Sequence, residues 1–280
     1  MTLNADLARA PFGSLLVEKQ VLWAPAYEFT LQLLGSTGII LPFGDPNHEA
    51  SDLTSFTTVG EEQAVFTYSE ARDTWDNGLT YEGPNGGVPI LTFNRVDEEA
   101  DSPDADYWFR DDAGGANGFS IGGWVNIDGS TGSRTVLAKR GTNNQEWAMR
   151  VRNTTDIVEA ALVDDSENVT ILRPFATALT VGTWAFVMLT YDGAGGVGSE
   201  DTIHCYLNGV LDDGTANNDG TYTGMENLTS VIGLGKRSEG TQFFGGRMAG
   251  GPLGTCFTQI ELTADQVLSK FQHDRALLGV

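Results

Sequence analysis

Short apolar runs followed by turn sequences recur along most of this chain of 280 residues. The clearest runs are residues 184–191 and 203–207. The first is followed by Asp192-Gly193 and the second by Asn208-Gly209. Because both dipeptides favour the positive φ angles of tight hairpin turns, the pattern predicts antiparallel β-strands.

Two further segments support this prediction, and one departs from it. Residues 147–152 and 157–163 alternate in polarity or are continuously apolar on either side of a turn sequence, which predicts another hairpin. At the C-terminus, Thr263 is a suitable N-cap and the apolar residues after it fall on one helical face. We therefore expect a short helix over residues 263–278.

The N-terminal segment is also apolar, particularly residues 10–34. Pro25 interrupts it, so extended structure is favoured over a helix. The segment could supply extra strands to the main domain or form an arm that docks onto a neighbouring subunit. We accordingly divide the chain into an N-terminal part, residues 1–35, and a main domain, residues 36–280. The candidate docking residues of the arm are Phe12, Leu15, Leu16, Val21 and Trp23.

A set of short motifs follows in order along residues 36–275. Residues 182–193 read Gly-x-Trp-x-x-Val-x-x-Thr-Tyr-Asp-Gly, and residues 119–125 read Phe-Ser-Ile-Gly-Gly-Trp-Val. Others lie at residues 91–94, 135–139, 231–233 and 262–267. The set resembles laminin-G-like domains, a branch of the concanavalin A-like jelly rolls. The resemblance implies an all-β fold, an antiparallel two-sheet jelly-roll sandwich with a short C-terminal helix, preceded here by the extended N-terminal arm.

Composition agrees with this fold and narrows the set of partners. The 35 glycines suit a sandwich with many turns. The formal net charge of -22 argues against binding to nucleic acid and to anionic lipid, because phosphate groups would be repelled. The charge is consistent either with a salty environment or with binding of divalent cations.

No targeting or membrane segment is predicted. The first ten residues lack the basic start and apolar core of a secretory signal, and no run approaches the roughly 18 apolar residues that a membrane span needs. A virion protein made in the host cytoplasm would reconcile this with a fold that is typical of extracellular proteins. An extracellular location is the alternative.

The sequence offers little support for catalysis. Cys205 and Cys256 lie in apolar segments, where buried free thiols are expected, and the three histidines accompany no Gly-x-Ser-x-Gly motif. Laminarinase-type enzymes of this fold carry acidic residues at alternate positions of one strand, but the chain contains no Glu-x-Asp-x-Glu motif. We therefore predict that the protein is not an enzyme.

Residues 97–106 form an acidic segment that contains Pro103 and reads as a solvated loop. Its carboxylates could bind one calcium ion, which prefers oxygen ligands. Relatives in the laminin-G-like family often carry calcium on the rim of the sandwich, but Asn94 and Ala249 stand here where the acidic residues of that family site would be. The candidate calcium ligands are Asp97, Asp101, Asp104 and Asp106.

Saccharide binding requires exposed aromatic rings near polar groups. Several aromatic residues lie in polar, loop-like segments, and packing beneath a loop is the alternative explanation for them. The candidates are Tyr107 and Trp108 first, then Trp75 and Tyr222.

These observations favour a non-catalytic structural or adhesive protein. The leading hypothesis is a virion surface component of a phage, such as a capsid decoration, fibre or tail subunit, which contacts other protein subunits and could bind glycans. The alternative is a carbohydrate-binding module of a bacterial secreted or surface protein.

Overall fold

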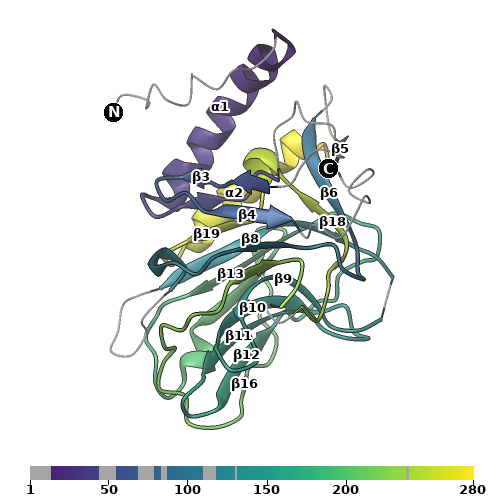
Figure 1. Cartoon of the computed structure of the whole chain (residues 1–280). Coiled ribbons are helices and arrows are strands. Elements are labelled where there is room, and N and C mark those ends of the chain that lie inside the picture. The colour runs from purple at the N-terminus through teal and green to yellow at the C-terminus, as the bar shows by residue number, and fades with distance from the viewer. Residues whose placement is uncertain are drawn as a thin grey trace.

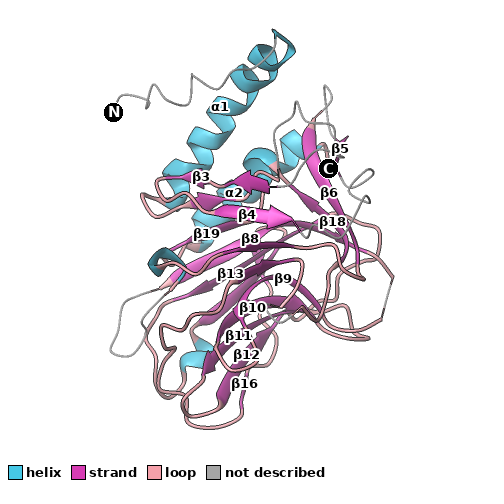
Figure 2. Cartoon of the chain, in the orientation of Figure 1, coloured by secondary structure: helices cyan, strands magenta, loops and turns pink. Residues whose placement is uncertain are grey.

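Two antiparallel sheets packed face to face make up most of the structure (Figures 1 and 2). The computed structural model describes residues 14–43, 55–68, 79–82, 87–109, 118–129, 131–237 and 240–280. Side chains are described from residue 24 onward, except those of residues 79–82. The arrangement confirms the predicted jelly-roll sandwich.

The first sheet has β8 (Phe119–Ile127) near its centre. Its order is β15 (Val210–Leu211), β14 (Ile203–Leu207), β13 (Ala185–Tyr191), β8, β18 (Gly245–Ala249), β6 (Val88–Asn94) and β5 (Leu79–Glu82). Beside this path, β19 (Cys256–Thr258) pairs with β8 and with β1 (Ile39–Ile40), which also pairs with β3 (Val59–Gly60).

The second sheet is built around the hairpin of β10 (Gln145–Val151) and β11 (Val158–Asp164), which confirms the hairpin predicted from the sequence. Its order is β16 (Asn217–Asn218), β12 (Val169–Pro174), β11, β10, β9 (Arg134–Arg140), β17 (Ile232–Leu234), β7 (Ala100–Ser102), β4 (Val65–Tyr68) and β2 (Ser55–Thr57).

The predicted turns differ in what they connect. Asn208 and Gly209 both have positive φ, 51° and 78°, and they join β14 directly to β15 as a tight turn. Asp192-Gly193 instead opens a longer connection from β13 to β14, which contains a short 3-10 helix, η6 (Ser199–Asp201). The two strands nevertheless pair with each other, as the sequence pattern predicts.

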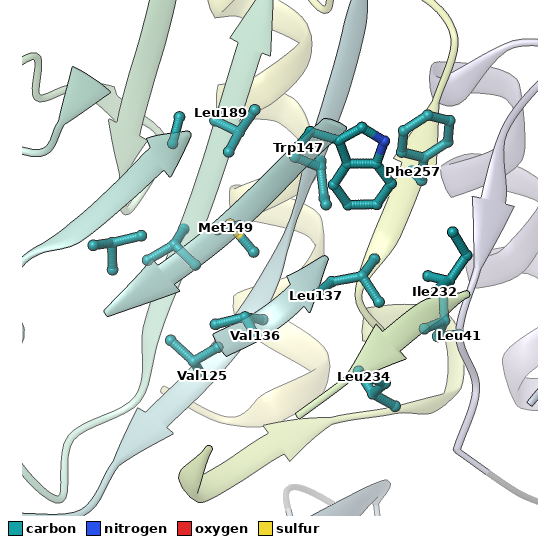
Figure 3. Close-up of a cluster of buried hydrophobic side chains, with 14 of the residues drawn as sticks. Leu41, Val125, Val136, Leu137, Trp147, Met149, Leu189, Ile232, Leu234 and Phe257 are labelled. Atoms are coloured by element: carbon teal, nitrogen blue, oxygen red, sulfur yellow. The ribbon is translucent and has the colours of Figure 1, made fainter. Parts of the chain in front are cut away.

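A hydrophobic cluster that includes Trp147 and Phe257 joins the two sheets (Figure 3). Phe257 of the first sheet stacks on Trp147 of the second, with ring centroids 5.5 Å apart and planes inclined by 22°. Phe257 also stacks on Phe119 at 5.8 Å and meets the edge of Trp108 at 5.3 Å. The indole nitrogen of Trp147 donates a hydrogen bond to the backbone oxygen of Trp108. The cluster therefore combines apolar burial with a hydrogen bond for the indole nitrogen of Trp147.

The outer face of the first sheet is apolar, and the helices cover it. Trp124 of β8 lies 5.6 Å from Phe271 of α2 (Ala264–Leu278). Thr263 and Gln266 form a reciprocal capping box at the start of α2. This confirms the predicted C-terminal helix.

The prediction of an extended N-terminal arm was wrong, because residues 14–34 form helix α1 (Ser14–Leu34) with Pro25 inside it. A proline in a helix interior costs about 3 kcal/mol. Ala26, Thr30 and Leu34 are spaced four residues apart and are all buried, and Leu34 belongs to the cluster beneath the helices. Burial of this stripe offsets the cost of Pro25, which faces solvent.

We expect Phe257→Ala to lower the free energy of unfolding by about 3–5 kcal/mol, because it leaves a cavity between two indole rings and Phe119. Urea denaturation measures this change. Val197→Ala is the control, since Val197 is 92% exposed and its truncation should change stability by less than about 0.5 kcal/mol. Equal stability of the two variants would contradict this account of the core.

Candidate ligand-binding site

The outer face of the second sheet differs in chemistry from that of the first. Both α-helices lie on the side of the first sheet (Figure 1), so neither covers this face. Across it runs a row of register partners with small or aliphatic side chains: Leu172, Ala161, Ala148, Ala138 and Gly233. Because most of these side chains are short, they project little from the middle of the face.

The adjacent row carries charge. Arg150 of β10 lies directly opposite Glu159 of β11, and Pro174 of β12 lies opposite Glu159 on the other side. The Nε of Arg150 donates to one oxygen of Glu159 at 2.7 Å, and the Nε of Arg152 donates to the other. Glu159 is 2% exposed. One buried carboxylate therefore orients two guanidinium groups.

A groove of about 560 Å³ lies beside this cluster. Its lining brings together the end of the β10–β11 hairpin, the end of β12 and the segment that leads to β16. The lining residues are Arg152, Ile157, Pro174, Phe175, Ala176, Asp213, Gly214 and Thr215.

Asp213 is the acidic member of the groove lining, and protein groups already engage its carboxylate. It accepts hydrogen bonds from the backbone N–H of Cys205 and from Arg173, and its carboxylate lies 2.9 Å from Nδ1 of His204. Burial acts to raise the pKa of Asp213, but these hydrogen bonds outweigh it and hold the pKa below its usual range. The cysteines are buried and free, as predicted.

The aromatic residues predicted to bind saccharide do not gather at this groove. Trp108 and Tyr222 are both fully buried in the core between the sheets, so neither ring can stack on a ligand. Their polar sequence surroundings suggested exposure, but the loops around them pack inward. Tyr107 is half-buried with its ring centroid 5.5 Å from that of Trp108, and Trp75 lies outside the described residues.

The four carboxylates predicted to bind calcium are not brought together. Asp101 pairs with Lys236 at 2.8 Å, whereas Asp104 pairs with Lys139 at 2.9 Å. Asp97 accepts a hydrogen bond from the side chain of Asn94, and Asp106 is exposed at the start of η5 (Asp106–Trp108). Among the residues that the structure describes, no group of three or more His, Cys, Asp or Glu side chains is placed to hold a metal ion.

Lys139 is the centre of a buried charge cluster instead. Its ammonium group contacts Glu146 and Asp104 and donates to the backbone oxygen of Leu228 at 2.7 Å. Burial raises the pKa of Glu146 to about 7, against the lowering effect of the Lys139 contact. Asp104 therefore contributes to folding as a partner of a buried lysine.

The predicted docking residues of the arm fall on α1 or before it. Leu15, Leu16, Val21 and Trp23 lie in the first half of the helix, where the structure describes the backbone alone, and Phe12 lies outside the described residues. In the second half, Phe29 stacks on His273 of α2 with ring centroids 4.2 Å apart. This contact attaches the second half of α1 to the sandwich.

The sequence did not lead to a prediction of the groove residues, although part of the relevant pattern was present in it. The hairpin over residues 147–163 was predicted, and Arg150 and Arg152 are two positions apart on it, hence on one face. The opposition of Glu159 follows from the register of that hairpin. No sequence pattern linked this hairpin to residues 213–215, which come from a distant segment of the chain.

The two packed antiparallel sheets define a jelly-roll sandwich. Residues 103–250 match the laminin-G-like family that is described as the concanavalin A-like lectin/glucanases superfamily. Because the match covers more than half of the chain, the protein belongs to this superfamily. No curated protein matches the chain.

Several solved structures share the fold. The binding domain of botulinum neurotoxin DC in complex with SialylT is 12% identical, with a TM-score of 0.55 over 86% of this chain and 52% of that chain. The binding domain of botulinum neurotoxin serotype G is 13% identical, with a TM-score of 0.52 over 86% and 52%. This chain thus spans about half the length of the structures that it matches. At such identities the likeness extends to the fold alone.

In the described part of the chain, no helix is both long enough and apolar enough to cross a membrane.

We expect stability to depend on pH through Glu146. Its pKa is about 7 in the folded protein and about 4.3 when unfolded, so between these values the folded state binds the proton more tightly. The free energy of unfolding should therefore fall as the pH rises from about 4.3 to 7.

Denaturation of Glu146→Gln across this range tests the expectation. The variant should lack this fall, and its stability relative to the wild type should rise by about 2–3 kcal/mol between the two pH values. Glu167→Gln, at an exposed position, is the matched control. Parallel pH profiles for the wild type and Glu146→Gln would contradict the assignment.

Proposed function

We propose that this protein is a non-catalytic saccharide-binding protein and that the groove at the edge of the second sheet holds the ligand. The observation that carries the proposal is the groove itself, which lies beside two guanidinium groups oriented by a buried carboxylate. Membership of a lectin and glucanase superfamily supports it.

The chemistry of the lining suits a sugar. Ile157, which is half-buried, and Ala176, which is exposed, offer apolar surface for the C–H face of a pyranose ring. Arg152 and Thr215 offer donors and acceptors at the sides.

The carboxylates of this face are poorly suited to glycoside hydrolysis. That reaction needs one carboxylic acid with a raised pKa and a second carboxylate to act as base or nucleophile. Glu159 is occupied by two arginines, and the pKa of Asp213 is lowered. Both groups therefore favour binding over proton transfer.

In its finer form, the proposal is that the protein is an adhesive component of a virion. Residues 36–280 would bind the saccharide, and the N-terminal segment would attach the protein to a neighbouring subunit. The first half of α1 extends away from the sandwich (Figure 2), which supports a role in contacts outside the domain. A carbohydrate-binding module of a secreted or surface protein would use the same groove.

Screening the protein on a glycan array tests saccharide binding. We expect a defined subset of saccharides to bind, and filling the groove by Ala176→Leu with Thr215→Leu should weaken that binding by more than about tenfold. Both positions are exposed, so the fold should persist. Ala194→Leu with Thr221→Leu changes the same residue types at exposed positions outside the groove and should bind as the wild type does. A wild type that binds no saccharide would overturn the proposal, as would undiminished binding by the filled variant.

Removal of residues 1–23 tests the attachment role of α1. This truncation keeps Ala26, Thr30 and Leu34, which are buried against the sandwich, so the remaining protein should fold. We expect light scattering to show an oligomer for the full chain and a folded monomer for the truncated one. An oligomer that survives the truncation, or a full chain that is monomeric, would contradict the attachment role.

A further inference from the structure

The two arginines beside the groove carry more hydrogen-bond donors than their contacts with Glu159 use. Each guanidinium carries five N–H donors, of which one is on Nε. For both Arg150 and Arg152, the recorded partner in the described part of the chain is Glu159, and the contact is made through Nε. The terminal nitrogens of both side chains therefore remain free to bind a ligand.

The positions of these donors are set by the hairpin. Arg150 and Glu159 are cross-strand partners, and Arg152 follows on the same side of the chain. A carboxylate that is 2% exposed is costly unless it is paired, so Glu159 holds both guanidiniums in place. The side chains of Arg150 and Arg152 are still 19% and 36% exposed, so solvent or a ligand can reach them.

The cluster beside the groove carries more positive than negative charge. Within it two arginines, Arg150 and Arg152, share one carboxylate, that of Glu159. Asp213, the acidic residue of the lining, pairs with Arg173, which also contacts Asp201, and accepts a hydrogen bond from the backbone N–H of Cys205. This local excess occurs in a chain whose net charge is -22, so it is not a consequence of composition.

We propose that the groove selects acidic saccharides, whose carboxylate or sulfate group is bound by the free terminal nitrogens of Arg152, with Arg150 adding a second contact. This rests on the proposed function and specifies its ligand class. The planar guanidinium fork matches the paired oxygens of a carboxylate or sulfate, and such charge-assisted hydrogen bonds are roughly twice as strong as neutral ones. The rest of the sugar would lie over Ile157 and Ala176.

The negative charge of the whole protein does not prevent such binding. At physiological ionic strength the Debye length is about 8 Å, so distant carboxylates are largely screened while a contact at the guanidinium is not. Added salt should therefore change the affinity for an acidic saccharide only weakly.

The test uses an array that presents sialylated, uronic-acid and sulfated saccharides, each beside its neutral parent saccharide. For the wild type we expect at least one acidic class to bind about tenfold or more tightly than its neutral parent. The three acidic classes distinguish a carboxylate ligand from a sulfate ligand.

Variants of single arginines then test which residue causes the preference for acidic saccharides. Arg152→Gln should abolish the preference for the acidic saccharide over its neutral parent. Arg152→Lys keeps the charge that Glu159 needs but lacks the fork, so it should lose most of the preference and remain folded. Arg140→Gln is the matched control, because Arg140 lies at the other end of β9 and β10, where its Nε donates to Gln145.

The outcomes separate the two proposals. Neutral saccharides that bind as tightly as acidic ones would overturn the acidic preference and leave saccharide binding intact. An acidic preference that persists in both Arg152→Gln and Arg152→Lys would overturn the role of Arg152. A wild type that binds no saccharide of any class would overturn both the preference and the proposed function.

Discussion

The packing of Phe257 between the sheets is the contact on which the arrangement of the molecule depends. Phe257 lies against Trp147, Phe119 and Trp108, and these four rings come from both sheets and from η5. Each buried aromatic ring removes a large apolar surface from water, and their offset and edge contacts restrict how the sheets can slide. The cluster therefore determines which faces of the two sheets point outward.

The two outward faces then have different roles because their alternating residues differ. On the first sheet the outward positions include Trp124, Phe186 and Met188, which require cover and obtain it from the helices. On the second sheet the corresponding positions include Ala148 and Arg150, which remain stable without such cover. The helices thus cover the outward face of the first sheet and leave that of the second sheet without a helix.

Burial also explains why two of the aromatic residues predicted to bind saccharide, Trp108 and Tyr222, cannot do so. Trp108 follows an acidic, proline-containing segment and Tyr222 a polar one, yet both rings are buried between the sheets. Asp101 and Asp104 belong to one acidic segment, but strand β7 ends between them and directs them to different lysines. The polarity of neighbouring residues indicates whether a segment lies near solvent. The burial of an individual side chain is instead determined by packing against elements far away in the chain.

Local interactions could be predicted from the sequence, because they involve residues only a few positions apart. The alternation in β10 and β11, the Asn208-Gly209 turn and the Thr263 cap of α2 are of this kind. The helical state of α1 was decided only by tertiary structure, since Pro25 argues against it locally and burial against η7 (Gly251–Leu253) and α2 outweighs that cost. The groove was decided in the same way: it exists because residues 213–215 cross to the edge of the second sheet and lie beside residues 174–176, a contact between segments that no local pattern relates.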